Sequence, residues 1–148
     1  MLWERLWTRR LGRKAGVWLE QDETLRCAIA VEPIGFRRSM VGPWAGLAPE
    51  GRIVPADSVA SRVPKDQALW FGLTTHRLAI VGRGGGTGAP RDLLASFGEG
   101  EIRLLDVTPY RITKVLTMTF ADESSAAFEM RRLISIKRFL AELGQGAS

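Results

Sequence analysis

The residue types that most often catalyse reactions or bind metals are scarce in this chain of 148 residues. It holds one histidine, His76, and one cysteine, Cys27. His76 lies in the polar segment 74–77 between two apolar runs, where we expect a turn residue that faces solvent. Cys27 lies inside an apolar run, where we expect a small buried side chain rather than a reactive thiol. We therefore predict no catalytic residue and no metal site, and a single cysteine excludes an internal disulfide.

Pairs of carboxylates are the next residues that could do chemistry. Asp122 and Glu123 form one pair, and Glu99 and Glu101 form another. Both pairs lie in predicted turns, with no histidine and no apolar pocket to tune their pKa values. We therefore predict that the protein is not an enzyme, needs no cofactor and takes no small-molecule substrate.

A glycine-rich segment satisfies the dinucleotide-binding pattern G-x-G-x-x-A through Gly84, Gly86 and Ala89. Such a site needs a long helix that begins at the motif, so that phosphate meets the helix N-terminus. The sequence instead continues with Pro90 and the short apolar run 93–97. The P-loop pattern also fails, because no Lys-Ser or Lys-Thr follows the glycines. We predict a loop between two strands.

Basic residues are concentrated at the N-terminus. The chain carries a formal net charge of +5, and residues 1–14 hold five basic residues against one acid, which leaves +1 for the rest. The basic residues are Arg5, Arg9, Arg10, Arg13 and Lys14. The body is thus nearly neutral, and the positive charge is carried by the N-terminal segment.

The same segment is predicted to be a helix over residues 2–19. Apolar residues recur at spacings of three and four, at Leu2, Trp3, Leu6, Trp7 and Leu11. A Trp/Leu stripe backed by arginines is typical of a helix at a membrane interface. Arg10 and Lys14 project into the same sector, however, and this favours a helix that packs on its own domain or on a second copy. A nucleic-acid-binding tail is a further alternative.

The rest of the chain predicts a single globular domain of short strands. The hydrophobic content of 45% is ordinary for such a domain, and no apolar run approaches the ~18 residues of a membrane-spanning helix. The basic residues also interrupt any signal-peptide core, so we expect a cytoplasmic protein, with peripheral attachment to the inner face of the membrane as an option. Strands are predicted at 25–31, 68–73, 78–81, 93–97, 102–107, 111–120 and 126–130, followed by a helix at 131–143. The hairpin at 68–82 is apolar on both faces and should lie centrally in the sheet.

Residues 33–67 are rich in proline and should form an irregular segment. Long irregular loops are uncommon inside compact domains, so this one is a candidate for function. Arg37, Arg38 and Trp44 are its candidate contact residues, with the alternative that Trp44 folds back over the core.

Three short segments resemble the bacterial pleckstrin-homology-like (PH-like) and GRAM-like domains. Leu73-Thr-Thr-His-Arg-Leu78 is similar to the L-T-D-R-R-L hairpin of these domains, and Leu94-Ala-Ser-Phe97 is similar to their fourth strand. Leu116-Thr-Met-Thr-Phe-Ala-Asp122 resembles the L-T-V-T-F-A-D-G segment that precedes their last strand. Seven antiparallel strands followed by one helix is also the order of the PH superfold. The resemblance covers roughly residues 20–143, apart from 36–67.

This resemblance implies a mainly β fold, a PH-like barrel of about seven antiparallel strands capped by a C-terminal helix, with an extra N-terminal helix. The helix would occupy 1–19, the PH-like domain 20–144, with 36–67 as an irregular insertion between the first two strands, and a tail 145–148. The resemblance also implies a binding or scaffold module. Many PH domains bind phosphoinositide head groups through basic residues at the end of the first strand and on the second. Arg37 and Arg38 match the first position, whereas 68–74 holds no Lys or Arg.

Three functions remain open at this stage. The first is a PH-like module that binds a protein partner or a second copy of itself, through a sheet edge or the Trp helix. The second is attachment to an anionic membrane through the N-terminal helix and the irregular segment. The third is nucleic-acid binding through the basic N-terminus, although no predicted strand alternates aromatic and basic residues as nucleic-acid readers do. The candidate contact residues are Trp3, Arg5, Trp7, Arg9, Arg10, Arg13, Lys14, Arg37, Arg38 and Trp44.

Overall fold

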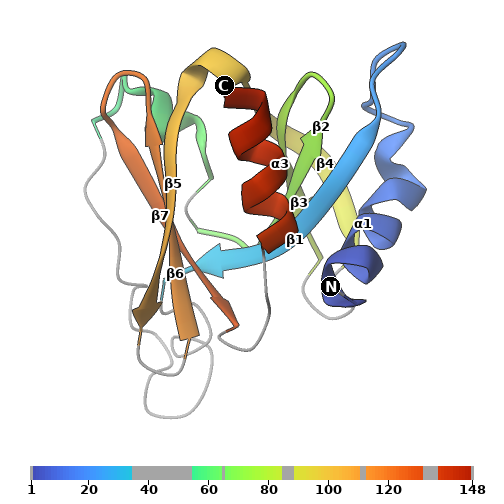
Figure 1. Ribbon diagram of the computed structural model, residues 1–148, viewed down its shortest axis with the longest axis horizontal. Helices are drawn as coiled ribbons and strands as arrows, with labels where there is room; N and C mark the ends of the chain where they lie inside the picture. Colours follow the sequence, from blue (N-terminus) through green and yellow to red (C-terminus); the bar gives the residue numbers. More distant parts are fainter. Residues whose placement is uncertain are drawn as a thin grey trace.

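The computed structural model describes residues 2–34, 55–64, 66–84, 89–110, 113–131 and 137–147. Helix α1 (Leu2–Ala15) opens this part of the chain, and helix α3 (Lys137–Ala147) closes it (Figure 1). The strands between them are β1 (Leu25–Pro33), β2 (Leu69–Thr74), β3 (Arg77–Arg83), β4 (Pro90–Gly98), β5 (Ile102–Tyr110), β6 (Thr113–Phe120) and β7 (Ser125–Arg131). Two single-turn 3₁₀ helices, η2 (Val59–Arg62) and η3 (Glu99–Glu101), complete the elements.

The strands form one antiparallel sheet in the order β4-β3-β2-β1-β7-β6-β5. β1 pairs with β2 from Leu25 to Val31, and it reaches β7 only at Glu32 and Pro33. The sheet therefore folds into two layers, β1–β4 and β5–β7, and β1 crosses from one to the other (Figure 1). α3 lies where the two layers diverge. The mainly β fold with seven antiparallel strands and a C-terminal helix is confirmed.

The hairpin of β2 and β3 is central in its layer, as predicted. Every position of β2 is buried, and β3 is buried at all but its two end residues. The inner face of β2 meets the second layer through Phe71, whose ring packs edge-on against Phe128 of β7 at 5.2 Å between ring centres. Because side chains alternate across a strand, Trp70 and Gly72 point to the opposite, outer face. Both faces of this hairpin are therefore covered by other elements, and this explains why the sequence of both strands is apolar throughout.

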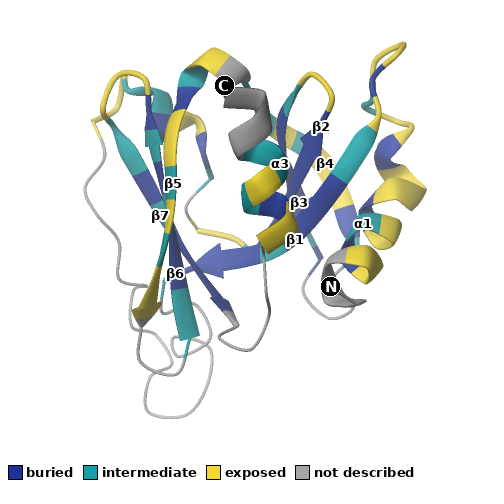
Figure 2. Ribbon diagram, in the orientation of Figure 1, coloured by how far each residue is buried: buried dark blue, intermediate teal, exposed yellow. Residues whose placement is uncertain are grey.

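Large aromatic side chains fill the space between the layers. Phe97 of β4 packs against Phe120 of β6 with 4.9 Å between ring centres, and Phe139 of α3 is fully buried. Figure 2 shows buried residues concentrated on β1, β2 and β3, with exposed residues along β5 and α1. α3 contributes its apolar stripe to this core, as an amphipathic helix does.

The elements differ from their predicted limits in ways that have local causes. α1 ends at Ala15 instead of residue 19, next to Gly16. The last helix begins at Lys137, whereas Arg131 ends β7. Three strands are longer than predicted and include a proline that lay outside the predicted strand: Pro33 ends β1, Pro90 begins β4, and Pro109 lies in β5. β4 and β5 are edge strands, where a proline removes no hydrogen bond that the sheet needs.

Two predicted loops are described only in part. Gly84 donates its backbone N–H to the Ala89 carbonyl at 2.8 Å, and β4 follows directly, so the glycine-rich segment joins two strands, with residues 85–88 outside the described part. The last part of the irregular segment, residues 55–64, is hydrogen-bonded to the turn between β6 and β7. There Val59 N–H donates to Asp122 Oδ2 at 2.8 Å, and Ala60 N–H donates to Ser124 Oγ at 3.0 Å.

Candidate functional site

The inner face of α1 is fixed against the outer face of the first layer. Trp7, Leu11 and Ala15 follow one another at a spacing of four and are all buried. The Trp7 ring packs edge-on against Trp70 of β2, with 6.4 Å between ring centres. Leu11 fills the space that the missing side chain of Gly72 leaves, because its Cδ2 lies only 2.7 Å from the place of a Cβ there. The helix therefore packs on its own domain, one of the alternatives that the sequence left open.

α1 also covers the free edge of β1. Beyond its pairing with β2, β1 has an open edge until it reaches β7. Thr8 Oγ1 accepts a hydrogen bond from the Ala28 N–H at 3.0 Å, and Arg138 of α3 donates to the Arg26 carbonyl at 3.2 Å. Arg26 lies at the irregularity of the β1–β2 pairing between Leu25 and Cys27, two residues before Ala28. Each of the two helices thus bonds one backbone group of β1: α1 accepts the Ala28 N–H, and α3 donates to the Arg26 carbonyl.

The outward face of α1 carries a line of arginines. Arg5, Arg9 and Arg13 are spaced by four and all exposed, so they lie within an arc of about 80° of the helix, opposite the buried face. Lys14 is also exposed, about 100° around the helix from Arg13, and Arg10 lies at the border, 5.9 Å from the centre of the Trp70 ring. Arg5, Arg9, Arg13 and Lys14 form no ion pair with any residue that the structure describes. We call Arg5, Arg9 and Arg13 the arginine stripe.

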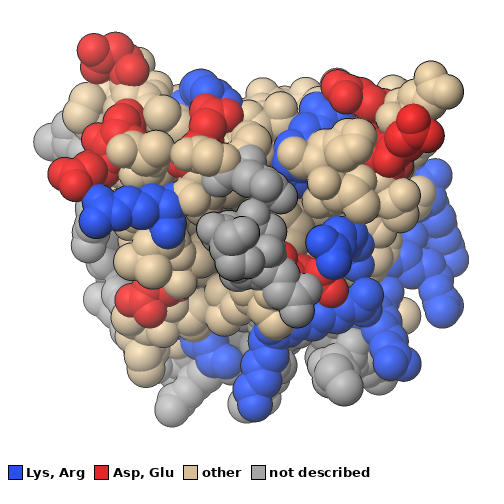
Figure 3. All heavy atoms as spheres, turned by 45° about the horizontal axis from the view of Figure 1, so that its top comes forward, with Lys and Arg blue, Asp and Glu red and all other residues tan. Residues whose placement is uncertain are grey.

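The surface around the arginine stripe is predominantly positive. Figure 3 shows Lys and Arg side chains gathered on the side of the molecule that α1 occupies, whereas the opposite side carries more Asp and Glu. Exposed cations that are close together and lack acidic partners raise the local potential and attract anions. Two exposed apolar side chains lie among them, Leu6 in the helix and Val17 just after it.

The candidate contact residues are thus divided. The arginine stripe lies on one face, whereas Arg10 and Lys14 are exposed on the side of the helix nearer Trp7, as their spacing predicted. Trp7 does not belong to this face, since only 9% of it is exposed and its contacts are in the core. The side chain of Trp3, together with Arg37, Arg38 and Trp44, lies outside the described residues.

The turn that holds the only histidine is a structural corner. Glu23 is buried and accepts hydrogen bonds from Arg77 Nε at 2.8 Å, from Thr74 Oγ1 at 2.6 Å and from the Glu20 N–H at 2.9 Å. The hydrogen bond from Arg77, aided by those from Thr74 and Glu20, lowers the pKa of Glu23 to about 2. The same pair raises the pKa of the Arg77 guanidinium. His76 is exposed beside this corner, as predicted.

Glu20, Glu23 and His76 place one ligand atom each within 4.8 Å of one another. This is compatible with a cation site by distance alone. Both Glu23 oxygens, however, already accept hydrogen bonds from the Arg77 guanidinium, at 2.8 and 3.0 Å. A cation would have to displace that arginine and would be repelled by its charge. The contacts of Glu23 therefore favour a structural role for this cluster over cation binding.

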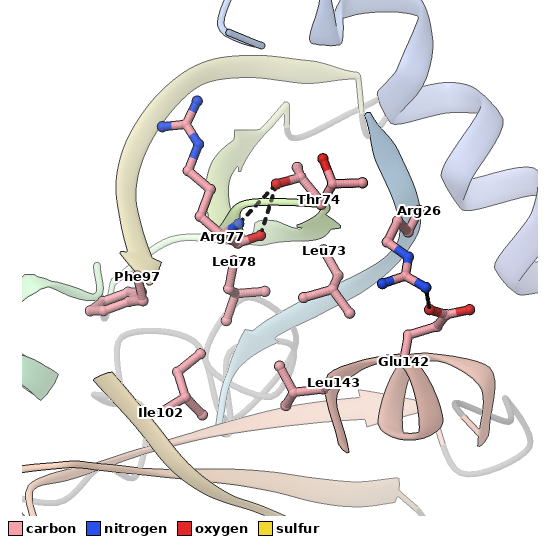
Figure 4. Close-up of a pocket in the computed structure, with 10 residues that line it drawn as sticks. Arg26, Leu73, Thr74, Arg77, Leu78, Phe97, Ile102, Glu142 and Leu143 are labelled. Atoms are coloured by element: carbon pink, nitrogen blue, oxygen red, sulfur yellow. Dashed lines mark hydrogen bonds and ion pairs between the residues drawn. The ribbon is translucent and has the colours of Figure 1, made fainter. Parts of the chain in front are cut away.

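A pocket of about 460 Å³, solvent at its mouth included, lies between the β2–β3 turn and α3 (Figure 4). Its lining is mainly apolar, with Leu73, Leu78, Phe97, Ile102 and Leu143. Arg26 and Glu142 form an ion pair that joins β1 to α3 at one side of it. Arg77 also lines the pocket and is paired with Glu23, so each charged side chain of the lining has an ion-pair partner, and the charges favour no particular ligand.

Comparison with known proteins identifies the fold. No model of a protein family matches the chain, and no curated protein matches it in sequence. Among solved structures it is similar to a pleckstrin homology domain from Shewanella amazonensis SB2B, with a TM-score of 0.54 and 14% identity. The match covers 95% of this chain and 88% of the other. The protein has a PH-like fold.

Within the PH-like fold, the residues that hold α1 in place were not found from the sequence. Thr8 and Glu23 act through contacts with residues 20 and 54 positions away, which local patterns do not reveal. Gly72 is the one residue whose sequence context could have indicated the packing of α1, because a glycine inside an apolar strand often marks the close approach of another element. No described helix is long and apolar enough to span a membrane.

Proposed function

We propose that this PH-like protein is a non-catalytic binding module that attaches to an anionic membrane surface through the outward face of α1. The observation that carries the proposal is the arginine stripe, three exposed cations in line on a helix that the domain holds fixed. Near an anionic lipid surface each Lys or Arg contributes about 1 kcal/mol. The three stripe arginines would together contribute about 3 kcal/mol, which is roughly 150-fold in partitioning.

The membrane is favoured over the other acidic partners by the composition of this face. Leu6 and Val17 lie among the cations and are 38% and 91% exposed. Apolar side chains beside cations suit the boundary between lipid head groups and acyl chains. They contribute little to binding the phosphates of a nucleic acid, where stacked aromatics would be expected.

The test is flotation of the full-length protein with two kinds of vesicle, one of phosphatidylcholine alone and one of phosphatidylcholine mixed with phosphatidylserine. We expect binding only to the mixed, anionic vesicles, and weaker binding as salt rises from about 50 to about 300 mM, because salt screens exposed charges. Equal binding to neutral vesicles, or none to anionic vesicles at the lowest salt, would contradict the proposal. A gel shift with mixed-sequence DNA in place of vesicle binding would favour the nucleic-acid alternative.

Association between copies is supported separately by β5, which has no second neighbour among the described strands. β5 ends the sheet, and Leu104 on it is 57% exposed. Edge strands with exposed apolar side chains pair readily with other strands. If copies associate here, light scattering should show a dimer that the Leu104→Lys variant abolishes. Because association depends on protomer concentration, a wild-type protein that is still monomeric at about 100 μM would exclude it.

A further inference from the structure

Val17 continues the line of the arginine stripe. Positions 5, 9, 13 and 17 are spaced by four, so on a helix they lie along one face. α1 ends at Ala15, but the next backbone hydrogen bonds keep the chain turning in the same sense: Val17 N–H donates to the Lys14 carbonyl at 3.3 Å and Leu19 N–H to the Ala15 carbonyl at 2.8 Å. Val17 is 91% exposed at the end of this line.

The residue next to Val17 holds the turn in place. The Trp18 ring lies 5.7 Å from the Arg77 guanidinium carbon, and its edge comes within 3.8 Å of the Cβ position of Gly72. Arg77 Nη2 also donates to the Trp18 carbonyl at 2.9 Å. Trp18 is therefore bound to the hairpin turn, and Val17 is presented outward from a fixed backbone.

We infer that Val17 inserts below the head groups of an anionic membrane while the arginine stripe binds their phosphates. This inference rests on the proposed function and adds to it an apolar contact with the lipid and the orientation of the protein on the membrane. A single exposed valine is ordinary on a protein surface. This one directly follows three exposed cations at helical spacing and has Leu6 beside them, which is the arrangement that an interfacial helix uses.

The inserted position can be probed with one label. Cys27 is the only cysteine and is fully buried, so a Val17→Cys variant offers a single accessible thiol for an environment-sensitive fluorophore such as NBD. With the phosphatidylserine-containing vesicles we expect a blue shift, a rise in emission and quenching by doxyl-labelled lipids. The matched control is Ala121→Cys in the turn between β6 and β7, which is also exposed but lies outside both proposed contacts, and a fluorophore there should keep the emission it has in water.

Unlabelled variants check that the fluorophore does not cause the insertion. Val17→Ala should weaken partitioning roughly tenfold, because two methyl groups no longer leave water, and Val17→Asp should weaken it further. Both variants should unfold at the wild-type temperature, since the side chain has almost no contacts.

The outcomes separate this inference from the proposed function. If the protein binds anionic vesicles but the label at position 17 stays in water, or Val17→Ala binds as well as the wild type, the insertion is wrong and electrostatic attachment stands. If the protein does not bind these vesicles, both are wrong. A blue shift that appears with DNA and not with vesicles would likewise overturn both.

Discussion

Glu23 joins three parts of the chain at one corner of the molecule. Its carboxylate binds the Arg77 guanidinium through two nitrogens and also accepts the Thr74 hydroxyl, while Arg77 reaches back to the Trp18 carbonyl. The segment after α1 is thereby tied to the β2–β3 turn. Charge-assisted hydrogen bonds of this bidentate kind are stronger and more directional than neutral ones. The position of α1 depends on this corner as well as on its own packing.

The pH dependence of stability should report this corner. The folded-state pKa of Glu23 is about 2, below its ordinary value of 4.5, so its contribution is complete above about pH 5 and is lost as the pH falls toward 2. Glu23→Gln should lower the free energy of unfolding by roughly 2–3 kcal/mol at pH 7. Urea titrations of both proteins at pH 7 and pH 3 measure this. A difference between the two proteins that does not shrink at pH 3 would contradict the assigned pKa.

Gly72 decides whether α1 can approach the sheet. A Cβ there would lie 2.7 Å from Leu11 Cδ2 and 3.2 Å from Leu25 Cδ1. Gly72→Val should therefore destabilise the protein by roughly 1–3 kcal/mol. The matched control is Gly98→Val on β4, where no atom lies within 4 Å of the new Cβ and the expected change is within about 0.5 kcal/mol. Equal midpoints of chemical unfolding for the two variants would show that α1 does not pack as described.

At the scale of elements, α1 has two faces with different roles. One covers the outer side of β1 and β2, and the other presents cations to solvent. The contact of Thr8 with Ala28 is the polar part of the covered face, since it satisfies a backbone N–H at the free edge of β1. An uncovered strand edge invites pairing with other chains, so α1 also protects the sheet.

Replacing Thr8 tests that polar contact. Thr8→Val removes the acceptor of the Ala28 N–H while keeping the shape of the side chain, and we expect a loss of about 1 kcal/mol in stability. Hydrogen exchange at the Ala28 amide should become faster, because the N–H is left without its partner. Thr8→Ser retains the hydroxyl and serves as the control. Unchanged exchange at Ala28 in Thr8→Val would mean that α1 does not hold this edge.

Elements with their own local pattern could be predicted from the sequence, and contacts between distant segments could not. The strands of the β2–β3 hairpin are short apolar runs separated by a polar turn, so their central place followed from the apolar residues on both faces. The packing of α1 remained open, because its surface on the sheet is made by Trp70 and Gly72, which lie far from the helix along the chain. Of the candidate site, the cations were found from their clustering, whereas Val17 was missed because a single valine after a helix has no pattern of its own.

At the scale of the whole molecule, the two layers have different surroundings. α1 and its cations lie on the outer side of the β1–β4 layer, while β5 and Leu104 lie at the far edge of the other layer (Figure 1). A molecule that rests on a membrane through α1 would thus keep β5 free for a protein partner. The two proposed contacts therefore do not compete for one surface, and a PH-like domain can use both at once.

The most direct test of the central claim is a charge series on the arginine stripe. Partitioning onto phosphatidylserine-containing vesicles is measured for the wild type and for variants with one, two and three of Arg5, Arg9 and Arg13 changed to Ala. Arg103→Ala/Lys114→Ala, on β5 and β6, loses two cations far from α1 and is the matched control. We predict a fall of about fivefold for each stripe arginine removed, at about 1 kcal/mol per charge, and little change in the control. An equal loss in the control and the double stripe variant would contradict the claim, because net charge and not the face of α1 would then govern binding.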